Sequence, residues 1–216
     1  MKKCGLALFL AAFTTFVTPP VMATSILNLT GLPAYTYDGE YVGPSTGNLN
    51  GGPTIWLYCD DFTGVATYPS SYEVSFSAIP SLQYAKFAQP GPPTSQQIDN
   101  YERVSILDYE MTLAANQNAT TIGGIQFAIW DIMDPSAPSP AGASSWIAWV
   151  YAQNPANYDF THVIVVTPVL ASDQEFLIMT ATPVPTPELE TLVMMGFGLV
   201  TMGLFRRRKM AVATKR

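Results

Sequence analysis

Cys59 and Gln126 carry side chains that can react with each other, although they lie far apart in the sequence. Cys59 lies in the aromatic segment 56–60, Trp-Leu-Tyr-Cys-Asp, and Gln126 lies in the apolar segment 124–130, Gly-Ile-Gln-Phe-Ala-Ile-Trp. A cysteine thiolate is a strong nucleophile and can attack the carboxamide carbon of a glutamine. If ammonia leaves, a thioester joins the two side chains and stays masked until an amine on a target surface attacks it.

Cys59 is the one cysteine that we expect in the mature chain. The other, Cys4, lies within residues 1–23, which we expect to be removed on export. A single thiol in an exported protein cannot form an internal disulfide, so it is either reactive or pairs with another molecule. The alternative interpretation is that Cys59 packs as a small buried hydrophobe.

Gln126 shares one helix face with Ile129 and Trp130, which follow it by three and four positions. A buried side-chain amide without a partner costs about 1–3 kcal/mol, so Gln126 needs a partner. That partner is either the thiol of Cys59, through a thioester, or a backbone group in the core. Both interpretations remain open at this stage.

The thioester chemistry needs a proton acceptor and a dry site. Only the thiolate attacks, yet burial among apolar groups raises the pKa of a thiol. A nearby group must therefore take the proton, and Asp60, Asp61 and Asp131 are the nearest acids in the sequence. Aromatic side chains must also exclude water, because water would hydrolyse the product.

These two segments resemble the thioester domains of bacterial surface adhesins, in which an aromatic-Cys motif and a later apolar Gln-x-x-Ile-Trp motif are joined. The resemblance implies that Cys59 supplies the thiol and Gln126 the acyl group. It also implies that Tyr58 and Trp130 are the flanking aromatic residues, with Asp60 beside the thiol. The product of amine attack would be a covalent anchor on a target.

The segments that must position these residues favour an α+β fold. Strand-forming runs come first, helical periodicity follows, and two further strand-forming runs close the domain, which predicts an antiparallel, β-rich domain with two or three inserted helices. We expect strands at 25–30, 54–59 and 72–78, and a hairpin of 162–169 with 173–180. We expect helices from Thr94 or Ser95 to 116, from Thr120 or Thr121 through 122–133, and at 146–153 capped by Ser144 or Ser145.

The charge of the predicted domain, residues 24–182, is strongly negative. It holds fourteen acidic residues and two basic ones, Lys86 and Arg103, which gives a net charge of −12. Such a domain repels phosphate backbones, so nucleic-acid binding is excluded. An anionic polysaccharide would also be repelled unless a divalent cation bridged the two.

No metal, cofactor or catalytic residue is predicted. His162 is the only histidine, so a zinc site lacks ligands, and we expect a structural role for it. The pairs Asp60-Asp61 and Asp131/Asp134 suit Ca²⁺ if they fold together, although a solvated acidic face is the favoured interpretation.

The N-terminus is typical of an export signal. Lys2 and Lys3 precede the apolar run 5–17, and Val21-Met22-Ala23 has the small-residue pattern of a cleavage site. We therefore expect a signal peptide at 1–23, cleaved between Ala23 and Thr24.

The C-terminus is typical of a membrane anchor. A Pro-rich linker at 183–190 precedes an apolar run at 191–205, about 22 Å long as a helix. A basic tail, 206–216, follows, and an apolar run closed by basic residues predicts a transmembrane helix with this end in the cytoplasm. The residues that stop the run are Arg206, Arg207, Arg208 and Lys209.

This arrangement resembles the PEP-CTERM sorting signal, which the membrane protease exosortase recognises in Gram-negative bacteria that make exopolysaccharide. Pro187-Glu188-Leu189 occupies the family's Pro-Glu-Pro position, and Leu189 departs from the second proline. The resemblance implies that exosortase and the cytoplasmic membrane are partners. It also implies that the domain is first anchored in the inner membrane, facing the periplasm, and then reaches the cell surface or the medium.

Taken together, the sequence predicts an exported surface or extracellular-matrix protein rather than an enzyme. Its expected further partners are exopolysaccharide or surface amines. Two other functions stay open: an exported hydrolase acting on exopolysaccharide, which would need two convergent carboxylates, and a passive membrane-tethered binding module.

Overall fold

The computed structural model describes residues 25–180 of the chain. The strands are β1 (Ser25–Gly31), β2 (Tyr35–Tyr37), β3 (Glu40–Val42), β4 (Ser45–Leu49), β5 (Thr54–Cys59), β6 (Ser70–Ala78), β7 (Val163–Pro168) and β8 (Phe176–Met179). The helices are α1 (Ser95–Thr112), α2 (Ala119–Met133) and α3 (Ala141–Tyr151), with short 3-10 turns at Lys86–Ala88, Ala114–Asn116 and Pro155–Asn157. These elements confirm the predicted α+β, β-rich domain with inserted helices.

Several sequence predictions fall on residues that lie outside this range. They are the signal peptide at 1–23 with its cleavage site, the linker at 183–190, the transmembrane helix at 191–205 and the basic tail at 206–216. Within residues 25–180, no helix has the length and apolar character needed to cross a membrane.

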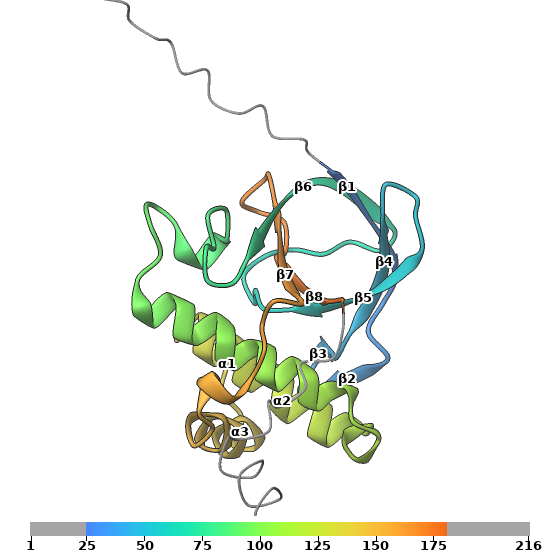
Figure 1. The fold of residues 1–216 in the computed structure, drawn as a ribbon. Helices are drawn as coiled ribbons and strands as arrows, with labels where there is room; N and C mark the ends of the chain where they lie inside the picture. The colour runs from blue at the N-terminus through green and yellow to red at the C-terminus, as the bar shows by residue number, and fades with distance from the viewer. Residues whose placement is uncertain (1–24, 181–216) are drawn as a thin grey trace, which may run out of the picture.

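Six strands close into an antiparallel barrel in the order β1-β4-β5-β8-β7-β6 (Figure 1). The strands predicted at 25–30, 54–59 and 72–78 become β1, β5 and β6, and the predicted closing hairpin becomes β7 and β8. β8 pairs with β5 through Tyr58↔Leu177 and Cys59↔Phe176. The last residue of β5 is therefore held by the last hairpin of the domain, and this contact fixes the position of Cys59.

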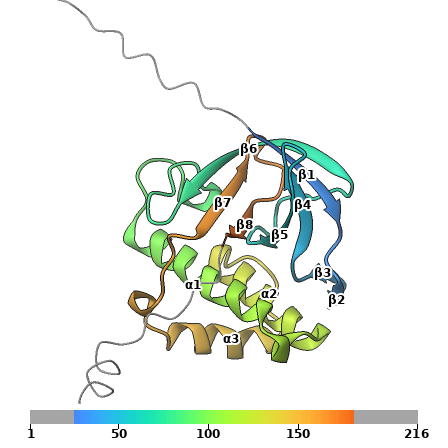
Figure 2. The same cartoon turned by 45° about the vertical axis from the view of Figure 1, so that its right-hand side comes forward.

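The helices pack together on one side of the barrel, beside the β2–β3 hairpin (Figures 1 and 2). α2 contacts α1, α3 and both strands of that hairpin. Thr94 caps α1 as predicted: its hydroxyl accepts from the Gln97 amide, and the Gln97 side chain accepts from the Thr94 amide. α1 ends at Thr112 rather than near 116, because a separate 3-10 turn follows it.

Two predicted helix starts are wrong. α2 begins at Ala119, because the Asn118 side chain accepts from the Thr121 amide and acts as the cap. α3 begins at Ala141 rather than at 146, and Pro140 precedes it with a φ of −64°. The Ser145 hydroxyl donates to the Gly142 carbonyl within the helix, so it does not cap the N-terminus.

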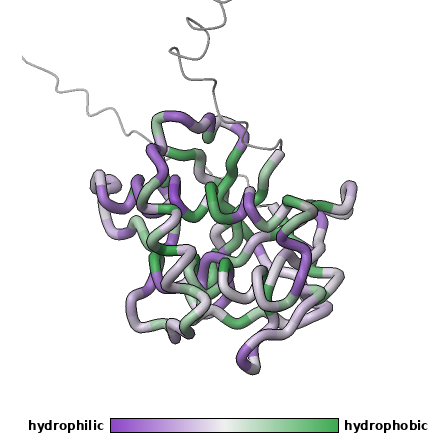
Figure 3. Tube along the Cα trace, turned by 90° about the horizontal axis from the view of Figure 1, so that it is seen from below, coloured by the Kyte–Doolittle hydropathy of each residue, from purple (hydrophilic) through white to green (hydrophobic). Residues whose placement is uncertain are grey.

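The apolar residues of the barrel and the helices form one core. Figure 3 colours the Cα trace by the hydropathy of each residue. α2 is buried along most of its length, which follows from its place between α1, α3 and the β2–β3 hairpin. A polar residue on this helix, such as Gln126, is therefore taken out of water. Its hydrogen-bond partners must come from neighbouring elements.

Gly123 permits the close approach of α2 to β2. A Cβ atom at this position would lie 2.2 Å from Cγ of Tyr37, a distance at which the two elements must separate. Gly123 lies one turn before Gln126, so this contact helps to set the depth at which Gln126 reaches β5. Neighbouring Gly124 is less crowded, since its nearest atom would lie 3.1 Å away.

We expect Gly123→Ala to lower the free energy of unfolding by about 1–3 kcal/mol, because the added methyl group overpacks the contact with Tyr37. Gly124→Ala is the matched control. It should have a smaller effect, because its crowding is partly offset by the higher helix propensity of alanine. Urea unfolding followed by circular dichroism measures both, and equal stabilities of the two variants would contradict the assigned contact.

Candidate functional site

The structure brings Gln126 into contact with Cys59. Nε2 of Gln126 donates a hydrogen bond of 2.6 Å to the backbone carbonyl of Cys59. The Gln126 residue is 1% exposed and Cys59 is 9% exposed. The partner of the Gln126 N–H is therefore a backbone group, the second of the two interpretations that the sequence left open, and this group belongs to the residue that carries the thiol. Solvent has little access to either residue.

Gly43 supplies the second hydrogen bond to Gln126. Its backbone N–H donates to Oε1 of Gln126 at 3.3 Å. Gly43 has a φ of +93°, and a Cβ atom there would lie 2.9 Å from Cγ2 of Ile122, so the position requires glycine. A backbone N–H on the amide oxygen polarises the carbonyl carbon for attack and stabilises an oxyanion formed there. The sequence indicates only a Gly-Pro turn at 43–44, and nothing in it pointed to Gln126.

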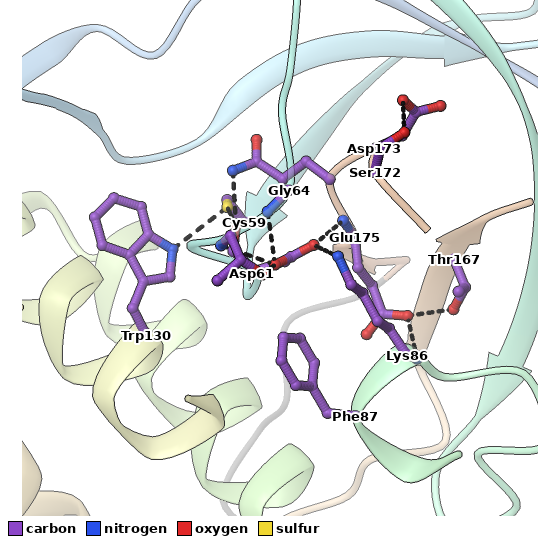
Figure 4. A network of polar contacts seen from close by, with 12 residues as sticks. Cys59, Asp61, Gly64, Lys86, Phe87, Trp130, Thr167, Ser172, Asp173 and Glu175 are labelled. Atoms are coloured by element: carbon purple, nitrogen blue, oxygen red, sulfur yellow. Dashed lines mark hydrogen bonds and ion pairs between the residues drawn. The ribbon is translucent and has the colours of Figure 1, made fainter. Parts of the chain in front are cut away.

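Trp130 contacts the sulfur itself. Its indole N–H donates to Sγ of Cys59 at 3.4 Å, as drawn in Figure 4. The rings of Phe62 and Phe127 lie 5.1 Å and 5.0 Å from the Trp130 ring, between centroids. Phe62 and Trp130 therefore line the pocket at Cys59, and Phe127 packs against Trp130. Phe62 was not identified from the sequence, where it is one aromatic residue among many.

Burial raises the pKa of the Cys59 thiol well above its ordinary value, and the hydrogen bond from Trp130 opposes that shift. The thiol donates to the backbone carbonyl of Asp61 at 3.4 Å. Cys59 is therefore held as a neutral thiol, and the indole N–H is the group placed to stabilise its thiolate.

Asp61 is the centre of the polar network beside the thiol (Figure 4). Its Oδ1 accepts from the amide and hydroxyl of Thr63, both at 3.0 Å, and from the amide of Gly64 at 2.9 Å. Its Oδ2 accepts from Nζ of Lys86 at 2.5 Å and from the amide of Glu175 at 3.3 Å. These bonds tie the loop after β5 to the segment before β8 and hold the loop next to Cys59.

A second set of carboxyl groups is buried without a cation. Burial raises the pKa of Asp60, Asp108 and Glu175, and for Asp60 the neighbouring Glu175 and Asp61 raise it further. Glu175 accepts from the Tyr101 hydroxyl at 2.6 Å and from the hydroxyl of Thr167. Neither carboxyl oxygen of Asp108 has a hydrogen-bond partner in the described part of the chain. Burial therefore disfavours the charged form of each of these carboxyl groups, and the hydrogen bonds to Glu175 oppose that shift.

The interpretation of the acidic pairs as a solvated face is wrong for Asp60 and Asp61, because both are fully buried. Asp131 and Asp134 are only partly buried, as expected for residues near the end of α2. Across residues 25–180, no group of three His, Cys, Asp or Glu side chains is arranged to hold a metal ion.

Tyr58 and Asp60, which the sequence placed around the thioester, do not line the pocket at Cys59. Tyr58 lines two hollows beside Trp56 instead, and Asp60 interacts with Glu175 and Asp61. The reason is the pleat of β5, in which successive side chains point to opposite faces. Only Trp130, of the predicted surrounding residues, contacts the sulfur.

An open pocket of about 480 Å³ leads to Cys59. Gly43, Phe62 and Trp130 line its inner part, and the loop at 64–68 and Gln174 form further walls. A small nucleophile therefore has a path from solvent to Cys59.

No protein-family model and no curated protein matches the sequence. Among solved structures, the N-terminal domain of the Streptococcus pyogenes pilus tip adhesin Cpa matches with a TM-score of 0.50 and 16% identity, over 76% of this chain and 97% of that one. The N-terminal thioester domain of a surface protein from Clostridium perfringens matches with a TM-score of 0.47 and 16% identity, over 74% and 100%. The N-terminal thioester domain of fibronectin-binding protein SfbI from Streptococcus pyogenes matches with a TM-score of 0.43 and 14% identity, over 70% of this chain and 91% of that one. The likeness to the Cpa domain shows a shared fold.

We expect Asp61→Ala to lower the free energy of unfolding by about 3–5 kcal/mol, because it leaves buried donors without an acceptor. Lys86→Met should have a smaller effect, since four other donors still bind the Asp61 carboxylate. Chemical denaturation measures both. A loss below 1 kcal/mol in Asp61→Ala would show that the network is not needed to hold the loop.

Asp108→Asn should stabilise the domain more at pH 8 than at pH 5. The folded state keeps the Asp108 proton above the pH at which the unfolded chain loses it, so the wild type loses stability as pH rises. One such group contributes at most about 1.4 kcal/mol per pH unit. Urea unfolding at the two pH values tests this, with Glu73→Gln, at an exposed residue, as the control. If the free energies of unfolding of Asp108→Asn and the wild type differ by the same amount at pH 5 and pH 8, the raised pKa of Asp108 is contradicted.

Proposed function

We propose that this domain forms an internal thioester between Cys59 and Gln126 and uses it to attach covalently to a target surface. The single observation that supports this best is the hydrogen bond of 2.6 Å from Nε2 of Gln126 to the backbone carbonyl of Cys59, which places the carboxamide beside the residue that carries the thiol. The Cys and Gln motifs of the sequence support the same reaction. The fold shared with a pilus tip adhesin domain supports an adhesive role.

The proposed reaction balances without a co-reactant. The sulfur of Cys59 attacks the side-chain carbonyl carbon of Gln126, so a C–S bond forms. The C–N bond then breaks, and the thiol proton leaves with the amide nitrogen as ammonia. During the attack, the indole N–H of Trp130 stabilises the thiolate, and the N–H of Gly43 stabilises the oxyanion.

The surroundings of Cys59 suit a bond that must survive in water. Trp130 contacts the sulfur and packs against Phe62 and Phe127, and both residues of the proposed bond are nearly buried. The pocket at the same place gives an open path to Cys59, whose backbone carbonyl accepts the hydrogen bond of Gln126. An amine entering there would form an amide with the Gln126 acyl group and release the thiol of Cys59.

We further propose that the domain works outside the cytoplasmic membrane. The expected signal peptide, the C-terminal apolar run and the resemblance to an exosortase signal support export, transient anchoring in the inner membrane and release to the cell surface or matrix. A hydrolase of exopolysaccharide is less well supported. Among the described residues that line the pocket at Cys59, Glu40 is the only acid, whereas two carboxylates are needed for hydrolysis of a glycosidic bond.

The intact mass of the purified exported protein should be lower than its sequence mass by one ammonia. Cys59→Ala and Gln126→Ala should each abolish this deficit, because each removes one partner of the bond. Gln96→Ala, at an exposed glutamine of α1, should keep it.

Native wild-type protein should also resist alkylation at Cys59 by iodoacetamide, and hydroxylamine treatment should expose the thiol. Circular dichroism of the three variants establishes that each is folded. A folded wild-type protein of full sequence mass, with Cys59 alkylated under native conditions, would rule the thioester out.

A further inference from the structure

Exposed apolar side chains line part of the pocket at Cys59. Three of the eight large hydrophobic side chains that are exposed in the described residues line it: Leu32, Tyr41 and Val65, which are 49%, 56% and 64% exposed. They come from three separate parts of the chain, namely the segment after β1, the strand β3 and the loop after β5. Because they are both exposed and part of the pocket, they form an apolar outer edge around the path to Cys59.

Among the residues 25–180 that line this pocket, Glu40 is the only charged one. It is exposed, and it begins β3 directly before Tyr41. The fully buried acids Asp60 and Asp61 do not line it. A single carboxylate on an apolar edge attracts one cation, and its field is weakened by salt because it is exposed.

On the basis of the proposed thioester, we infer that this pocket selects the ammonium group of a lysine set among apolar residues of a partner protein, and that Glu40 is the specificity-determining residue. The acidic domain attracts a cationic partner, and Glu40 holds the lysine ammonium at the mouth of the pocket. The apolar edge then contacts the side chains beside that lysine. An amino sugar fits this edge less well, because its hydroxyl groups would lose water against Leu32 and Val65.

The transfer step follows from the same geometry. The lysine gives up one proton to solvent and attacks the Gln126 acyl carbon as the neutral amine. A C–N bond forms, the C–S bond breaks, and the second amine proton ends on the sulfur of Cys59. The product is an amide between Gln126 and the partner, with a free thiol at Cys59, so release of that thiol reports the reaction.

The test uses the exported protein in its thioester form and two peptides, each with one lysine. In one peptide the lysine stands between leucine and phenylalanine, and in the other between glycine and serine. Thiol release should be about tenfold faster with the apolar peptide, the factor expected if roughly 60 Å² of apolar surface is buried at the edge. Tyr41→Ser and Val65→Ser should each reduce this preference.

Glu40→Gln should slow thiol release by both peptides about fivefold at low salt. This is the effect expected in water when the lysine ammonium loses an opposite charge about 4 Å away. High salt should remove the difference between wild type and variant. Glu73→Gln, which makes the same change at an exposed residue of β6 outside the pocket, should leave the rates unchanged.

Hydroxylamine, which is uncharged at neutral pH, separates this inference from the thioester itself. It should react with wild type and Glu40→Gln at equal rates. If hydroxylamine releases the thiol but Glu40→Gln leaves the peptide rates unchanged, or if glucosamine reacts faster than the apolar peptide, the selectivity inference is wrong and the thioester stands. If hydroxylamine releases no thiol from the wild type, the proposed function itself fails.

Discussion

The buried amide of Gln126 is the constraint on which the arrangement of this domain depends. A side-chain amide on a helix packed between other elements must find partners inside the protein, because it has no access to water. Here the last residue of β5 accepts its N–H and the turn before β4 donates to its oxygen. The barrel, the helices and the β2–β3 hairpin must therefore meet at one point, and that point is Cys59.

The electrostatics of the core follow from the composition of the domain. With two cations against fourteen acids, most buried carboxyl groups cannot form an ion pair. Lys86 pairs with Asp61, whereas burial raises the pKa of the remaining buried acids, and the hydroxyl donors to Glu175 oppose that shift. The charged centre lies beside the loop that covers Cys59, so the same ion pair that stabilises the core also shapes one wall of the pocket.

Local patterns predicted most of the elements of this fold. Strands β1, β5, β6, β7 and β8 follow from runs of β-favouring residues, and α1 follows from its capping residues and apolar stripe. The short strands β2, β3 and β4 were not separated within residues 24–50, because strands of three to five residues carry little periodic signal. The start of α3 was misplaced because a proline, rather than the serine that usually caps a helix, precedes it.

The sequence by itself determined the candidate pair, Cys59 and Gln126, and the face on which Gln126 and Trp130 lie, because residue types and helical spacing are local properties. Only the tertiary structure decided which groups surround that pair. Gly43, in the turn between β3 and β4, donates to Gln126, and Asp61 accepts from donors in three segments. The pleat of β5 directs Tyr58 away from the pocket. These contacts join residues far apart in the chain, and no local pattern specifies which distant segments the closure of the barrel will bring together.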